Sequence, residues 1–154
     1  MARKKAKLWF DKQLAEILAQ KIVMHYKAFD SKSFVQEIAK WVEPLELKAR
    51  LSLFAESLDK YLPDNYKKAT DIILNCLGEE NTEETGMFTD FYWVMPFATF
   101  VETYGLDDLE TSLNAIAEIT KRNTGEFAIR PYLETYPEET FKQALEWSRD
   151  ENFH

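Results

Sequence analysis

A glutamate and an arginine one helical turn apart form the arrangement in this sequence best suited to chemistry. They lie in the segment Thr124-Gly125-Glu126-Phe127-Ala128-Ile129-Arg130-Pro131. With Thr124 as N-cap, Glu126 falls in the first turn of a helix, where the macrodipole stabilises an ionised carboxylate by about 0.3–1 kcal/mol. Arg130 then lies on the same face of that helix. This pair suits a site where positive charge develops beside a phosphate backbone, and the alternative is an ordinary surface ion pair.

Aromatic and basic residues supply further candidates. Tyr92 and Trp93 lie at the start of an apolar segment, where aromatic rings either fill a core or stack on nucleic-acid bases. The basic residues near the amino terminus form either a solvated tail or a phosphate clamp: Arg3, Lys4, Lys5, Lys7 and Lys12.

The sequence predicts neither a metal site nor a bound cofactor. His25 falls in an apolar stripe and is expected in or beside the core, while His154 is the last residue. The single cysteine, Cys76, lies on an apolar face and is expected to be buried, so no set of ligands has the spacing of a metal site. Gly-rich phosphate loops and serine or cysteine nucleophile motifs are also missing from the sequence.

Length and composition predict one helical domain in the cytoplasm. The chain has 154 residues, of which 45% are hydrophobic and 14% aromatic, with only 4 Gly and 5 Pro. One cysteine fits a reducing compartment, and neither a signal peptide nor a stretch of membrane-spanning length is apparent. The formal net charge of -8 argues against strong binding of a polyanion by this chain alone.

Apolar residues recur at helical spacing along almost the whole chain. We expect helix N-caps at Asp30, Asp64 and Asp107, and we expect Pro44 in the first turn of a helix. Pro131 is expected to break or bend a short helix. The last helix, from about residue 135, is expected to turn four residues inward: Phe141, Ala144, Leu145 and Ser148.

The helices pair in order along the chain, with pairs that begin near residues 12, 44, 91 and 125. This repeat predicts an all-α fold, a HEAT-like α-solenoid of stacked antiparallel helix pairs, because no single pair can bury its apolar face alone. The alternative is an irregular helical bundle. We expect one domain, 1–154, whose halves 1–78 and 91–154 are joined by an acidic loop at 79–90.

Several motifs resemble those of AlkC-type DNA alkylation repair proteins. In chain order they are Trp9-Phe10-Asp11, Phe29-Asp30, Leu45-Glu46-Leu47-Lys48-Ala49-Arg50, Tyr92-Trp93, Phe100-Val101-Glu102, Tyr104-Gly105-Leu106-Asp107-Asp108, Glu126-Phe127-Ala128-Ile129-Arg130-Pro131-Tyr132-Leu133, Pro137-Glu138, Thr140, Glu146-Trp147-Ser148 and Asp150. The resemblance covers nearly the whole chain in order, and the block from Glu126 to Leu133 is its most specific part.

The resemblance implies a helical-repeat DNA glycosylase that removes cationic lesions, such as 3-methyladenine and 3-methylcytosine, without flipping the base. It implies duplex DNA with alkylated bases as partner and places the protein in the cytoplasm, at the nucleoid when acting. Glu126 matches the family's first active-site carboxylate. Trp93 and Arg130 are expected to line the groove, and we also predict Lys121 and Arg122 as DNA contacts.

The resemblance also implies more chain than is present here. The family continues beyond the region of His154 with an arginine-rich helix and a second acidic motif. We therefore expect this chain to correspond to the front part of such a glycosylase, to need a carboxyl-terminal half or a partner chain, and to turn over poorly alone. The alternative from another class is a non-catalytic helical-repeat module for protein interaction.

Overall fold

The structure is built entirely from helices over the residues that it describes. A computed structural model describes residues 5–81, 91–123 and 126–149, except for the side chains of residues 126 and 127. The helices, in chain order, are η1 (Ala6–Trp9), α1 (Lys12–Val23), α2 (Ser31–Trp41), α3 (Leu47–Tyr61), α4 (Tyr66–Asn75), η2 (Tyr92–Val94), α5 (Met95–Tyr104), α6 (Leu109–Thr120), α7 (Glu126–Thr135) and α8 (Pro137–Ser148). No strand occurs in this part of the chain, so the predicted all-α class is confirmed.

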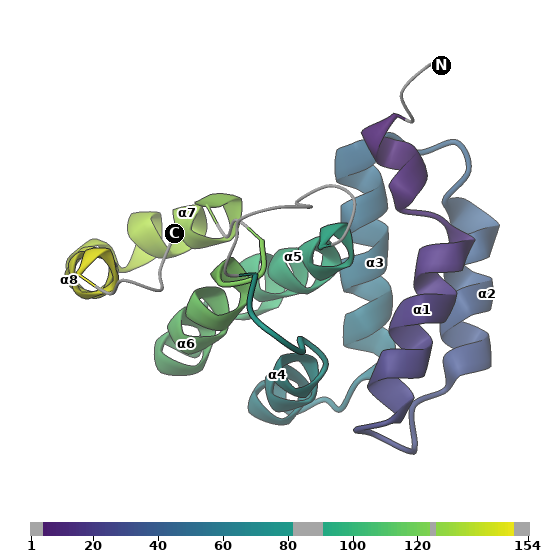
Figure 1. Ribbon diagram of the computed structural model, residues 1–154, viewed down its shortest axis with the longest axis horizontal. Coiled ribbons are helices and arrows are strands. Elements are labelled where there is room, and N and C mark those ends of the chain that lie inside the picture. Colours follow the sequence, from purple (N-terminus) through teal and green to yellow (C-terminus); the bar gives the residue numbers. More distant parts are fainter. Residues whose placement is uncertain (1–4, 82–90, 124–125, 150–154) are drawn as a thin grey trace.

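The helices stack in two rows, as predicted for a helical-repeat fold. In one row α3 packs against α5, and α5 packs against α7. In the other row α4 packs against α6, and α6 contacts α8. At one end of the stack α1 and α2 lie beside α3, while α7 and α8 lie at the other end (Figure 1). No helix in the described ranges is long and apolar enough to cross a membrane.

Helix starts are fixed by local capping. Asp30 caps α2 as predicted, because its carboxylate accepts a hydrogen bond from the third backbone amide beyond it. The predictions of Asp64 and Asp107 as caps are each wrong by one residue. Asn65 caps α4 and Asp108 caps α6, both with the same geometry. In each case two adjacent residues carry a suitable oxygen, and the turn that precedes the helix selects the second.

The prediction for Pro44 is wrong, and of the two alternatives predicted for Pro131 the break does not occur. Pro44 precedes the helix rather than opening it, since α3 begins at Leu47. Pro131 lies inside α7, which continues to Thr135. A proline at this position removes one backbone donor from the helix. The next residue, Tyr132, is fully buried, and its hydroxyl donates a 2.7 Å hydrogen bond to the carbonyl of Val101 on α5.

The core lies between the rows and is rich in large aromatic side chains. Six of the largest fully buried side chains are aromatic: Phe10, Phe34, Phe54, Phe97, Phe100 and Tyr132. Cys76 is buried among them as predicted, and this burial raises the pKa of its thiol to about 11.

Gly105 lies where three hydroxyl groups converge between the rows. The Ser112 hydroxyl donates a 2.7 Å hydrogen bond to the Gly105 carbonyl and shares another, also of 2.7 Å, with the hydroxyl of Tyr66. A Cβ atom at position 105 would collide with the hydroxyls of Tyr66, Ser112 and Tyr132. The glycine is therefore required by close packing rather than by a positive φ angle.

A buried arginine ties the amino-terminal segment to the α2–α3 connection. The side chain of Arg50 is 2% exposed and is held by backbone carbonyls alone. It donates to the carbonyls of Leu45 (2.8 Å), Lys7 (3.0 Å), Phe10 (3.1 Å) and Glu43 (3.1 Å). Four acceptors offset much of the cost of burying the guanidinium.

Two predictions about the core are wrong. His25 follows the end of α1 and is exposed, because the helix stops at Val23, before the apolar stripe reaches the histidine. On α8, Phe141 is 59% exposed and Leu145 is 44% exposed. This helix contacts its neighbours through a different face, on which Thr140 is fully buried.

Candidate functional site

A groove of about 450 Å³ lies between α3, α5 and α7. Its walls come from three helices that are far apart in the sequence but adjacent in the first row of the stack (Figure 1). The lining residues are Leu47, Lys48, Leu51 and Ser52 from α3, Met95, Thr99, Glu102 and Thr103 from α5, and Arg130 from α7.

Helical spacing explains why these residues share one groove. On α5, Met95, Thr99 and Thr103 are four residues apart and therefore lie in a row. The Thr99 hydroxyl donates to the carbonyl of Met95 (3.1 Å), and that of Thr103 donates to the carbonyl of Thr99 (2.8 Å). On α3, Leu47 and Leu51 form a second such row. The groove thus has a largely apolar floor, with its charged side chains contributed by single positions.

Two cations and one carboxylate give the groove its charge. Burial raises the pKa of Glu102, and the positive charges of Lys48 and Arg130 oppose that rise. Lys48 is exposed and, among the described residues, forms no ion pair. Arg130 is also exposed. The three charged side chains that the structure describes in the groove sum to one positive charge, in contrast to the net charge of -8 of the whole chain.

Two acids lie on α3 beyond the residues that line the groove. They are Glu56 and Asp59, which are near Tyr104 at the end of α5. Burial raises the pKa of Tyr104, and the negative charges of Asp59 and Glu56 raise it further. An anion is therefore attracted to Lys48 and Arg130 and repelled by these two acids.

Glu126, the predicted catalytic carboxylate, is the first residue of α7. Its backbone position agrees with the expected placement at a helix start, one turn before Arg130. The side chain of Glu126 and the predicted N-cap, Thr124, lie outside the described residues. The catalytic role of Glu126 therefore stays a prediction.

Trp93 lies in η2, at the entry to α5, and is half-buried. Its ring packs edge-on against Phe97 at a centroid distance of 6.4 Å. The ammonium of Lys21, from α1, lies 4.2 Å from the centroid of the indole. The indole thus joins α1 to α5 through a cation–π contact, and it does not line the groove that contains Arg130.

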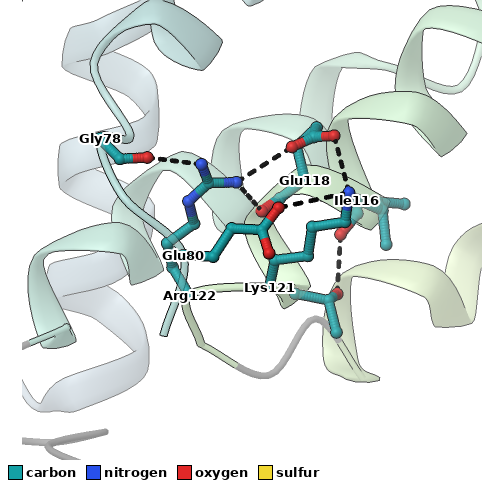
Figure 2. Close-up of polar contacts among 7 residues, drawn as sticks. Gly78, Glu80, Ile116, Glu118, Lys121 and Arg122 are labelled. Atoms are coloured by element: carbon teal, nitrogen blue, oxygen red, sulfur yellow. Dashed lines mark hydrogen bonds and ion pairs between the residues drawn. The ribbon is translucent and has the colours of Figure 1, made fainter. Parts of the chain in front are cut away.

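Lys121 and Arg122, the other predicted DNA contacts, belong to an ion-pair cluster at the end of α6 (Figure 2). Lys121 pairs with Glu118 at 3.2 Å and with Glu80 at 3.7 Å. Arg122 pairs with Glu118 at 3.0 Å and donates a hydrogen bond to the carbonyl of Gly78. These contacts connect the end of α6 to the segment after α4 (Figure 2).

The structure thus brings one predicted site residue, Arg130, into the groove and adds two that the sequence did not single out. Lys48 and Glu102 lie within motifs that carry the family resemblance, Leu45–Arg50 and Phe100–Glu102. Membership in those motifs is the only feature of the sequence that could have identified them as site residues. Among the described residues no group of three or more histidine, cysteine, aspartate or glutamate side chains could hold a metal ion.

Comparison with known proteins establishes the fold. The chain is 29% identical over 147 residues to an uncharacterised protein of Bacillus subtilis strain 168, YhaZ, covering 94% of this chain and 38% of that protein. It superimposes on the structure of the Pseudomonas fluorescens alkylpurine DNA glycosylase AlkC, bound to DNA containing an abasic site analogue, with a TM-score of 0.84. The chain has the AlkC fold.

The superposition on AlkC includes 97% of this chain at 24% sequence identity, and 40% of the AlkC chain. The AlkC-like fold expected from the motifs is therefore confirmed, as is the helical-repeat architecture. The chain spans about two fifths of the length of both proteins that it matches. No family model matches the sequence.

Proposed function

We propose that this chain forms the helical-repeat part of a DNA glycosylase that repairs alkylated bases. One observation carries the proposal, namely the AlkC fold over 97% of the chain, because the matching protein is an alkylpurine DNA glycosylase that was bound to DNA. The motif resemblance supports cationic lesions of the 3-methyladenine and 3-methylcytosine type as substrates, attacked without base flipping.

Glu126 is the carboxylate that we assign to the reaction. Cleavage of the N-glycosidic bond leaves positive charge on the sugar in the transition state, while the alkylated base departs as a neutral molecule. An ionised carboxylate near the sugar stabilises that charge more than it stabilises the ground state, and only this difference accelerates the reaction. Placement in the first turn of α7 favours the ionised form.

We propose duplex DNA as the partner of the same surface. Arg130 lies one turn beyond Glu126 on the exposed side of α7 and is assigned to the DNA backbone. Trp93 does not line the groove that contains Arg130, but it lies two residues before the groove residue Met95, and we assign it to the adjoining surface, where Lys21 adds a positive charge beside the ring. For Lys121 and Arg122, DNA contact requires phosphate to replace Glu118, and because the two side chains are only 21% and 10% exposed, it also requires them to turn outward.

The decisive experiment is single-turnover excision of 3-methyladenine from duplex DNA. Because the chain spans 40% of AlkC, we would assay it alone and as a chimera in which it replaces the matching part of AlkC. We expect Glu126→Gln to slow excision by the chimera about 10²–10³-fold, the usual size of a lost electrostatic contact. The melting temperature should change little, because glutamine has nearly the same shape.

Glu134→Gln is the matched control, since Glu134 is an exposed glutamate on the same helix. It should leave the excision rate unchanged. An active chimera in which Glu126→Gln excises within a few-fold of the parent would remove Glu126 from the mechanism. A well-folded chimera that neither excises lesions nor binds duplex DNA would contradict the proposed function and favour an interaction module.

A further inference from the structure

We propose that the groove between α3, α5 and α7 binds a backbone phosphate of duplex DNA between Lys48 and Arg130. This inference rests on the proposed function and adds to it a defined phosphate subsite, with Lys48 as a phosphate contact and Glu102 as a residue that limits its strength. Neither residue is part of the proposed chemistry at Glu126.

The shape of the groove favours a ligand that approaches from outside with only its charged group inserted. Leu47, Leu51 and Met95 line the groove and offer no hydrogen-bond donors from their side chains. The hydroxyls of Thr99 and Thr103 already donate to backbone carbonyls of α5. The charged donors are therefore the ammonium and the guanidinium, which come from α3 and α7 on opposite sides of α5.

The charge distribution selects an anion for this position. Elsewhere on the chain several cations are engaged with acids, as in the ion pairs Lys7–Glu46 (2.8 Å), Lys60–Glu37 (3.1 Å) and Arg122–Glu118 (3.0 Å). Within the described part of the chain, Lys48 has no such partner. A lysine ammonium that is exposed beside a concave surface is available to a phosphate at no cost in broken ion pairs.

Glu102 repels a phosphate in the groove, so its neutralisation and that of Lys48 should have opposite effects on binding. Its carboxylate lies in the groove, close enough to Lys48 and Arg130 for their charges to lower its pKa against the effect of burial. An ionised Glu102 repels an entering phosphate while reducing the mutual repulsion of the two cations. Neutralising it should strengthen phosphate binding, whereas neutralising Lys48 should weaken it.

Two acids on α3, outside the groove, restrict the path of a bound DNA strand. Glu56 and Asp59 lie further along α3, so a DNA backbone that ran the length of this helix would meet them. A backbone that crosses α3 near its amino-terminal half and continues toward α7 avoids both acids.

The test is fluorescence anisotropy of the 154-residue chain with a short labelled DNA duplex, over a series of salt concentrations. Lys48→Gln should weaken binding several-fold. It should also reduce the magnitude of the slope of log affinity against log salt by about one, the amount that corresponds to one phosphate contact. Arg130→Gln should do the same, and Glu102→Gln should tighten binding. Lys67→Gln is the matched control, because Lys67 is exposed on α4 in the other row.

Nuclear magnetic resonance separates DNA from free anions as the ligand. Titration with the duplex should shift the amide signals of Lys48, Ser52 and Thr103, and the control lysine should stay unaffected. Shifts with inorganic phosphate but not with the duplex would overturn the proposal, as would equal affinities of the parent and Lys48→Gln. If the parent does not bind the duplex, the phosphate site in the groove is rejected and the proposed function is weakened. If binding depends on the groove residues but the chimera does not excise lesions, only the glycosylase activity is rejected.

Discussion

The outermost helices of the stack, α2 and α8, differ in how they use similar sequence patterns. On α2 the apolar residues Phe34 and Ile38 are fully buried, and its exposed face carries Lys32, Gln36 and Lys40, while Trp41 at the last position of the helix is 54% exposed. On α8 the apolar residues Phe141 and Leu145 are 59% and 44% exposed. Both helices are amphipathic, but only α2 turns its apolar face toward the rest of the protein.

The difference shows that an amphipathic pattern identifies the apolar face of a helix but does not predict whether that face is buried. A helix at the edge of a stack has neighbours on one side only, so its apolar face is buried only if it turns toward them. α2 contacts both α1 and α3. α8 contacts α7 and α6 through a side that includes the buried hydroxyl of Thr140, which donates to the carbonyl of Tyr132 at 3.1 Å.

Truncating one phenylalanine on each helix tests this comparison directly and should give the largest effect. Phe34→Ala should lower the free energy of unfolding by about 3–5 kcal/mol, since it opens a cavity at a fully buried position. Phe141→Ala should change it by less than about 1 kcal/mol. Urea denaturation followed by circular dichroism measures both. Comparable losses would show that Phe141 is covered in solution, and a dependence of stability on protein concentration would identify self-association as the cause.

Two arginines extend the comparison to polar contacts at the same two ends. Arg50→Met should cost about 2–4 kcal/mol, because the buried carbonyl of Phe10 and three partly buried carbonyls lose their donor. A buried carbonyl without a partner costs about 1–3 kcal/mol, whereas the partly buried ones can relax toward water. Arg149→Met, at the end of α8, should change stability by no more than about 0.5 kcal/mol, because that side chain is exposed.

The same denaturation measurement with Arg50→Lys distinguishes the guanidinium fork from simple positive charge. A lysine ammonium cannot reach four carbonyls in the same plane, so Arg50→Lys should recover only part of the loss. Full recovery by lysine would mean that charge alone, rather than the geometry of the fork, holds the amino-terminal segment.

The smallest expected effect is a difference in acid sensitivity. A hydrogen bond from the hydroxyl of Tyr61 (2.7 Å) lowers the pKa of Glu37, with Lys60 adding to the shift. A carboxyl whose folded pKa is depressed contributes stability above its ordinary pKa and loses that contribution as the pH falls through the folded value. Tyr61→Phe should therefore cost less than about 1 kcal/mol near neutral pH, and less at acid pH.

Tyr136→Phe serves as the control for that pH dependence. The hydroxyl of Tyr136 donates to the neutral carbonyl of Leu106 at 2.7 Å, so its loss should cost the same across the acid range. Stability curves against pH for the parent and both variants make the measurement. Parallel curves for the parent and Tyr61→Phe would show that the hydrogen bond from Tyr61 does not lower the pKa of Glu37.

Local features of the fold were predictable from the sequence, because helix caps and helical spacing depend on neighbours within one turn. Asp30 was identified as a cap on these grounds. The choice between Asp64 and Asn65 was not predictable, since it depends on the path of the preceding turn. The continuation of α7 through Pro131 depends on the burial of Tyr132 against α5, which is a tertiary contact.

In the candidate site, too, local features were predictable from the sequence and tertiary contacts were not. The spacing of Glu126 and Arg130 on one helix is local and was visible in the sequence. The meeting of Arg130 with Lys48 and Glu102 requires that α3, α5 and α7 lie side by side, which no pattern within one segment specifies. The ion pair between Lys121 and Glu80 likewise joins the end of α6 to the segment after α4, which no local pattern specifies.

Burial of the single cysteine has a practical consequence for following ligand entry. With its pKa raised to about 11, the thiol of Cys76 is almost wholly protonated at neutral pH and is shielded by the core, so alkylating reagents react with it slowly. A cysteine introduced in place of Ser52, on the exposed rim of the groove, would be the only readily labelled thiol in the chain. An environment-sensitive fluorophore attached there would report occupancy of the groove in the otherwise unaltered protein.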